Sequence, residues 1–155
     1  MTLMAGHCSF TEADGNARVF ALCELKGSTT LVPVSMPGET SVRGIRSSDE
    51  GRRLLVQVGR LQRTLTRVYI GMSVPRNHDL MDAQLALRLT FDAGNHTDLP
   101  LARRGVRGNR YAIMAIMTVN GMEWNIGRMQ PAELFTDRIT LSELHSVPSW
   151  WSSRA

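Results

Sequence analysis

The sequence predicts an all-β fold, an antiparallel β-sandwich with a short C-terminal helix. The first observation is an alternation of apolar and polar residues: Leu85, Leu87, Leu89 and Phe91 occupy every second position of one segment. Residues 68–74 alternate in the same way. Because successive side chains of a strand point to opposite faces, each segment has one face for a core and one for water. This pattern is typical of antiparallel sheets and not of parallel strands buried on both faces.

The first part of the chain contains three predicted strands and a long loop. Residues 17–25 are apolar on both faces, which predicts a central strand covered on both sides. Residues 29–34 form a β-branched run interrupted by Pro33, which predicts an edge strand because proline cannot donate a ladder hydrogen bond. The polar, glycine-punctuated residues 38–51 predict a long loop, and a strand follows at 52–58.

Two further strands and a second loop follow. The alternating pattern places the strands at residues 66–74 and 83–91, with polar connections between them, and residues 92–108 are predicted to be a loop. Short strands at near-regular spacing, separated by turn signals, are characteristic of a sandwich or a barrel.

An Asn-Gly pair at 120–121 predicts a β-hairpin over residues 109–129. A two-residue type I′ turn needs positive φ at both central positions, and Asn-Gly suits it best. Such a turn sets the register symmetrically about itself, and the expected pairs are Val119 with Met122, Met117 with Trp124, and Ala115 with Ile126. A helix over 111–119 is the weaker interpretation, because this stretch is rich in β-branched residues and ends in Asn-Gly.

The C-terminal region is predicted to begin with a helical turn. Pro131 stands where the first residue of a helix needs no backbone N–H, and Leu134, Phe135, Ile139, Leu141 and Leu144 form an apolar stripe after it. We therefore expect one β-sandwich domain over residues 1–146 and a flexible or docking tail over 147–155. Trp150 and Trp151 in this tail would expose a large apolar area, so we expect them to pack on the body or on another subunit of a homo-oligomer.

Size and composition are those of a soluble globular protein. The chain has 155 residues, enough to bury a core without disulfides or metals. No apolar run approaches the roughly 20 residues that a membrane-spanning helix needs, so we expect a cytoplasmic protein with no membrane contact. Cys8 and Cys23 suit a reducing compartment. Cys23 lies in a predicted buried strand and is interpreted as a small apolar residue, although a disulfide between the two stays open.

Two pairs of acidic residues are candidate calcium ligands. Asp49 and Glu50 lie side by side in a glycine-containing loop, and Asp79 and Asp82 lie in another connection between strands. Calcium takes six to eight oxygen ligands, which loop carboxylates can supply. The favoured alternative is that these acids are solvated turn residues.

One basic segment is a candidate nucleic-acid contact. Its members are Arg103, Arg104, Arg107 and Arg110, with Tyr111 beside them as a stacking face. The favoured alternative is a solvated loop, because the segment contains two glycines and joins two strands. The net charge is +4 with Lys26 as the only lysine, and this arginine bias more often reflects a GC-rich genome than a function.

No pattern in the sequence indicates an enzyme. The four histidines, His7, His78, His96 and His145, are scattered without metal-ligand spacing. A nucleophile elbow, a phosphate loop, a paired-cysteine motif and a dinucleotide fingerprint are all absent from the sequence. We therefore expect a non-enzymatic protein.

The order of these segments resembles that of the tellurium-resistance (TerD-type) stress proteins. The matching stretches are residues 20–27 (FALCELKG), 47–58 (SSDEG and the strand after it), 65–70, 85–89, and the hairpin arms 111–117 and 120–125. The resemblance covers most of residues 17–145. It implies a β-sandwich that acts in chemical-stress response, with calcium as the candidate ligand. Calcium-binding members have aspartates in the early strand, where this chain has Arg18, Val19 and Phe20.

Three functional hypotheses follow. The first is a non-enzymatic, cytoplasmic TerD-like binding or scaffold protein, with Asp49 and Glu50 as the remaining cation ligands. The second is a self-assembling structural protein, such as a viral or phage shell or tail component, that associates through sheet edges and the tryptophan pair. The third and weakest is a nucleic-acid-binding module that uses residues 103–111.

Overall fold

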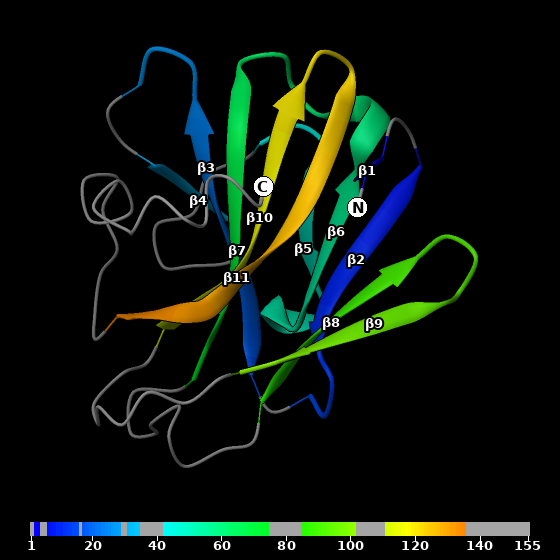
Figure 1. Ribbon diagram of the computed structural model, residues 1–155, viewed down its shortest axis with the longest axis vertical. Helices are drawn as coiled ribbons and strands as arrows, with labels where there is room; N and C mark the ends of the chain where they lie inside the picture. Colours follow the sequence, from blue (N-terminus) through cyan, green and yellow to red (C-terminus); the bar gives the residue numbers. More distant parts are fainter. Residues whose placement is uncertain are drawn as a thin grey trace.

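A computed structural model gives the fold of the chain and describes residues 2–3, 6–15, 17–28, 31–34, 42–74, 85–101 and 111–135. Within these ranges the strands form two antiparallel sheets (Figure 1). In spatial order, the six-stranded sheet contains β1 (Thr2–Leu3), β11 (Glu123–Phe135), β10 (Tyr111–Asn120), β7 (Leu65–Ser73), β3 (Arg18–Leu25) and β4 (Leu31–Val34). The five-stranded sheet contains β5 (Ile45–Ser48), β6 (Arg53–Gln57), β2 (His7–Glu12), β8 (Ala86–Phe91) and β9 (His96–Pro100). Two single turns of 3₁₀ helix flank β6, η1 (Asp49–Gly51) and η2 (Val58–Arg60).

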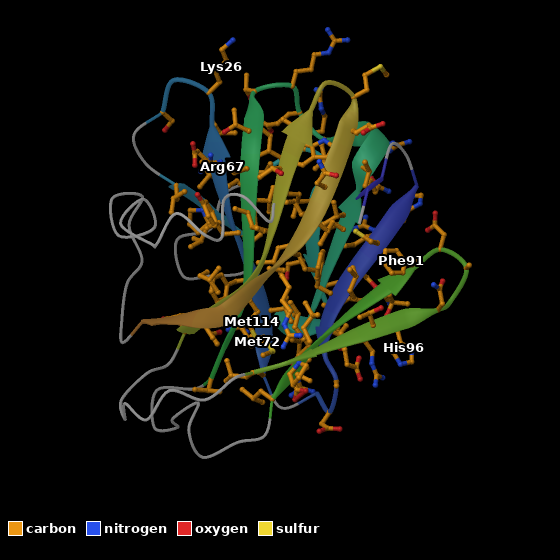
Figure 2. All side chains as sticks on the ribbon, in the orientation of Figure 1. Lys26, Arg67, Met72, Phe91, His96 and Met114 are labelled. Carbon is orange, nitrogen blue, oxygen red and sulfur yellow. The ribbon has the colours of Figure 1, made fainter. Side chains whose placement is uncertain are left out.

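The all-β, antiparallel prediction is confirmed. Every pairing between the described strands is antiparallel, and the two sheets share one apolar core. The core takes alternate residues of each strand, for example Val68, Ile70 and Met72 of β7, which are fully buried. Met72 and Met114 lie together in the middle of the sandwich in Figure 2. In the part of the chain that the structure describes, no helix is long and apolar enough to cross a membrane.

Strand β3 is buried on both faces, as its sequence predicts. Val19, Ala21 and Cys23 point into the core between the sheets. The alternate residues belong to a second group of buried side chains on the outer face of the six-stranded sheet: Phe20, Leu22, Tyr69, Tyr111, Ile113 and Ile116. The edge position predicted for the strand with Pro33 is also confirmed, since β4 is the last strand of its sheet.

The predicted hairpin is present, but its turn is one residue further along the chain. Asn120 pairs with Glu123, so the two loop residues are Gly121 and Met122. Gly121 has φ of 65° and Met122 is not among the positive-φ residues, which matches a type II′ turn with glycine first and not type I′. Met117 therefore pairs with Ile126 and not with Trp124. The shift moves each partner by two residues, so the same side chains still share the core face.

A β-bulge in β10 also departs from strict alternation. Ile113 pairs with Gly71 of β7 and Ala115 pairs with Ile70, which leaves Met114 as an extra residue. Because of this extra residue, Met114 and Ala115 both contribute to the core although they are consecutive. The β10–β11 pairing shifts at the same point, between the pairs Ile113–Glu133 and Ala115–Arg128.

The prediction that a helix begins at Pro131 is wrong. Strand β11 continues to Phe135, which pairs with Tyr111. Pro131 lies in the stretch of β11 opposite the bulge, where the ladder is interrupted and a missing N–H costs no pairing. The remainder of the predicted helix, 136–145, and the tail 147–155 lie outside the described residues.

Two short strands occupy segments that were predicted to be loops. Strand β5 lies within 38–51 and β9 lies within 92–108, and each is an edge strand of the five-stranded sheet. Their side chains are mostly exposed, so no apolar alternation marks them in the sequence. Their extended conformation comes from hydrogen bonding to a neighbouring strand, β5 to β6 and β9 to β8.

Candidate functional site

The acidic pair predicted from the sequence lies at an exposed turn. Asp49 and Glu50 form η1, which joins β5 to β6. Both have left-handed backbone conformations, with φ of 53° and 55°, and Gly51 follows with φ of 85°. Non-glycine residues with positive φ are uncommon and mildly strained, so the turn is held by the strands on either side of it.

The described residues do not assemble a calcium site around this turn. Calcium needs six to eight oxygen ligands, and no group of three or more histidine, cysteine or acidic side chains gathers anywhere in the described ranges. Asp79 and Asp82 lie outside those ranges. Of the four predicted calcium ligands the described residues place Asp49 and Glu50, and these two side chains supply fewer oxygen ligands than calcium takes.

Of the basic segment predicted from the sequence, residues 103–111, the structure describes only Tyr111. Arg103, Arg104, Arg107 and Arg110 lie outside the described residues, as do Trp150 and Trp151. Tyr111 is the first residue of β10 and is 7% exposed. Its ring contacts Phe20 edge-to-face, with the centroids 5.9 Å apart and the planes at 83°. This packing leaves little of the ring free to stack on a base.

The two cysteines are core residues with free thiols. Cys8 lies in β2 and Cys23 in β3, and both are buried. Burial raises the pKa of Cys8 to about 12, with a smaller contribution from the charge of Asp92, and burial alone raises the pKa of Cys23 to about 12. Both thiols are therefore protonated at neutral pH, which suits the structural role predicted for Cys23.

A hollow of the described surface lies at the β5 edge of the five-stranded sheet. It has a volume of about 550 Å³, and its lining residues are Val42, Arg43, Gly44, Ile45, Arg46, Leu55, Gln57 and Gln62. A second hollow of about 390 Å³ adjoins it and is lined by Arg43, Gln62, Arg63 and Thr64. We call the two together the arginine groove.

Two hydrogen bonds between Arg43 and Gln62 hold the two sides of the arginine groove together. The backbone N–H of Arg43 donates to Gln62 Oε1 (3.0 Å), and the backbone N–H of Gln62 donates to the carbonyl of Arg43 (3.3 Å). Gly44 has φ of 93°, and a Cβ there would lie 2.8 Å from the backbone of Leu61. Only glycine lets the turn before β5 approach the 60–62 segment this closely.

The guanidinium groups of the arginine groove carry positive charge without a local counter-charge. Arg43, Arg46 and Arg63 are exposed, and no ion pair to any of them occurs in the described part of the chain. Arg88 of β8 differs, because it forms a two-point pair with Asp98 of β9 at 2.8 and 3.0 Å. The hydrogen bond from Arg88 lowers the pKa of Asp98.

A smaller hollow of about 210 Å³ continues across the same sheet. Its lining includes His7, Ser9, Leu55, Thr90 and Asp92. The backbone N–H of His7 donates to Asp92 Oδ2 (3.0 Å), and His7 Nδ1 lies 3.5 Å from Asp92 Oδ1. Leu55 also lines the arginine groove. Nε2 of Gln57, another lining residue of the groove, lies 3.4 Å from His7 Nε2. The outer face of the five-stranded sheet, whose strands β5, β6, β2 and β8 lie next to one another in Figure 1, thus carries both hollows and polar lining residues.

Sequence reasoning did not find the arginine groove, although a charge signal was available. Between residues 43 and 63 the chain has the arginines Arg43, Arg46, Arg52, Arg53, Arg60 and Arg63, against the acids Asp49 and Glu50. The arginines are spread over 21 positions, so they do not look like a cluster. The pairing of β5 with β6 and the contact with residues 60–62 bring three of them to one groove.

Comparison with known proteins identifies the fold. No protein-family model and no curated protein sequence matches the chain. The crystal structure of a protein of unknown function, SAV2460, aligns with a TM-score of 0.60 at 13% identity, over 87% of this chain and 92% of that one. SCO6318 from Streptomyces coelicolor, described as a homologue of the telluride resistance protein TerD, aligns with a TM-score of 0.55 at 14% identity, over 86% of this chain and 92% of that one. The resemblance to TerD-type proteins is thus confirmed at the level of the fold, which is what such low identities establish.

Proposed function

We propose that this chain is a non-enzymatic binding protein of the TerD type that acts in the response to chemical stress. The observation that carries the proposal is the fold shared with a TerD homologue over most of both chains. The order of segments in the sequence supports the same assignment. The outer face of the five-stranded sheet is the surface that meets the ligand, because hollows lined by charged and amide groups occur there.

The chemistry of the interior supports binding without catalysis. The core between the sheets is mostly apolar, with Ser9 and Glu12 as the buried polar residues of the described part of the chain, and its two thiols are protonated at neutral pH. A thiol acts as a nucleophile or reductant through its thiolate, so Cys8 and Cys23 are poor candidates for redox chemistry on a metalloid oxyanion. In this proposal the protein binds its ligand at the outer face of the five-stranded sheet and uses no group of the core.

Survival in tellurite tests the stress function. Expression of the chain in a tellurite-sensitive bacterium should raise the tellurite concentration that stops growth, compared with an empty vector. A matched control is the core variant Leu87→Asp, which places a charge at a fully buried position and should not fold. Unchanged sensitivity in cells that accumulate soluble wild-type protein would refute the proposed function.

A reduction assay with purified protein tests the absence of catalysis. Tellurite reduction by a thiol or by NADH should proceed at the rate seen in buffer when the protein is added. A rate that rises in proportion to protein concentration, and survives replacement of both cysteines by alanine, would show an enzyme instead.

A further inference from the structure

We propose that the arginine groove binds a phosphate-bearing polyanion, a short chain of at least two linked phosphate groups. Such a site does not depend on the proposed stress function, since it follows from the side chains at one edge of the five-stranded sheet. Each of its two hollows, of about 550 and 390 Å³, falls in the size range of small-molecule sites, about 300–1,000 Å³.

The first step of the argument is the type of charged group. Arg43, Arg46 and Arg63 each present a planar guanidinium, which matches phosphate oxygens with two parallel hydrogen bonds. None of the three is paired with a carboxylate in the described ranges. Their positive charge is therefore available to a ligand.

The second step is that the groove is already formed without a ligand. The reciprocal hydrogen bonds between Arg43 and Gln62 fix the backbone that carries two of the arginines. Gln62 Nε2 also donates to Thr64 Oγ1 (3.0 Å), which holds the segment on either side of Arg63. A ligand then orders only the ends of the arginine side chains, and little binding energy is lost in arranging the site.

The third step concerns the number of negative charges. An anion with one charge would leave at least two of the three guanidinium groups without a counter-charge. A chain of two or three phosphates carries enough charge for all of them, and its oxygens can also accept hydrogen bonds from the amide of Gln57. None of the described residues that line the groove is aromatic, so they offer no stacking surface for a base.

Calorimetric titration with inorganic triphosphate tests the proposal. The wild-type chain should bind one triphosphate, more weakly as salt rises from 50 to 200 mM. Arg43→Gln and Arg63→Gln should each weaken binding about tenfold, the effect of losing one charge-assisted hydrogen bond. Arg18→Gln is the matched control, since it removes the same charge from an exposed position of β3 in the other sheet and should change the affinity less than about twofold.

Several outcomes would overturn the proposal. These are no heat with triphosphate, an equal loss of affinity in Arg18→Gln, or orthophosphate binding as tightly as triphosphate. A single-stranded oligothymidylate that binds more tightly than triphosphate, with an affinity that rises with length, would assign the groove to nucleic acid instead. Circular dichroism and thermal unfolding establish that each variant is folded. Because survival in tellurite is a separate measurement, loss of triphosphate binding and loss of the stress function can be told apart.

Discussion

Gly71 of β7 lies where the six-stranded sheet leaves no room for a side chain. A Cβ at this position would overlap the carbonyl oxygen of Ala112 and lie 2.7 Å from Cζ of Phe20. Gly71 lies beside Phe20 across the β3–β7 pair and beside Ile113 across the β7–β10 pair. The absent side chain makes space for the Phe20 ring, which in turn contacts Tyr111.

Replacing Gly71 by alanine should lower the free energy of unfolding by about 1–3 kcal/mol, the usual cost of overpacking a filled site. The control is Gly59→Ala in η2, where a Cβ meets no atom within 4 Å and φ is not positive. That change should stay within about 0.5 kcal/mol of the wild type. Urea unfolding measures both variants, and equal stability of the two would contradict the close packing at Gly71.

The buried thiols make stability fall at alkaline pH. Each has a pKa near 9.0 when exposed and about 12 in the fold. Below pH 9 the thiols are protonated in both the folded and the unfolded chain, so they do not reduce stability. Above pH 9 the unfolded chain loses these protons while the folded chain keeps them up to about pH 12, and the free energy of unfolding falls over this range. Between pH 9 and 12 each thiol should therefore reduce the free energy of unfolding by up to about 1.4 kcal/mol per pH unit.

The double variant Cys8→Ala, Cys23→Ala tests this pH dependence. Its free energy of unfolding, measured by urea titration under reducing conditions from pH 8 to 10.5, should decline less steeply than that of the wild type. Parallel curves for the two proteins would show that the thiols are not desolvated in the fold.

At the scale of an element, the β10–β11 hairpin shows how a turn sets a register. The two loop residues differ in what the turn demands of them. Gly121 adopts a positive φ of 65°, which favours glycine, whereas the side chain of Met122 is 82% exposed and makes little contact with the fold. An Asn-Gly pair admits two turns, one centred on Asn120-Gly121 and one that begins at glycine. The cross-strand contact of Val119 with Trp124 occurs only in the second.

Gly121→Ala should therefore destabilise the fold by about 1–3 kcal/mol, because alanine is strained at positive φ. Met122→Ala should change stability by less than about 0.5 kcal/mol, since its side chain is in solvent. Thermal unfolding of the two variants compares them directly. A larger effect at Met122 than at Gly121 would contradict the observed turn.

At the scale of the whole molecule, three of the four described edge strands, β4, β5 and β9, carry residues that discourage pairing with other strands. The edge strand β9 carries His96, Asp98 and Pro100, and Figure 2 shows His96 on this outermost hairpin. Strand β4 contains Pro33, and β5 carries Arg46. Charges and prolines on edge strands are common means of preventing edge-to-edge association. Assembly through β4, β5 or β9 is therefore disfavoured, and we expect the predicted homo-oligomer to associate through Trp150 and Trp151.

Light scattering tests the predicted homo-oligomer. The wild-type protein should have a mass of at least two chains, each of 17.2 kDa. The variant Trp150→Ser, Trp151→Ser should shift the mass toward that of one chain, because the apolar area that favours association is removed. A wild-type mass of one chain at every concentration would refute the oligomer prediction.

The sequence by itself determined the fold class and the buried faces of β3, β7 and β8, whereas β2 was not predicted from it. Alternation in β7 and β8 and the two apolar faces of β3 are local patterns, and burial follows from them directly. The tertiary structure alone decided the strand order, the bulge at Met114, the short edge strands β5 and β9, and the strand that replaces a helix at Pro131. These features depend on hydrogen bonds to distant partners. The arginine groove belongs with them, since Arg43 and Arg63 line one hollow only because hydrogen bonds between Arg43 and Gln62 join two turns that are twenty residues apart.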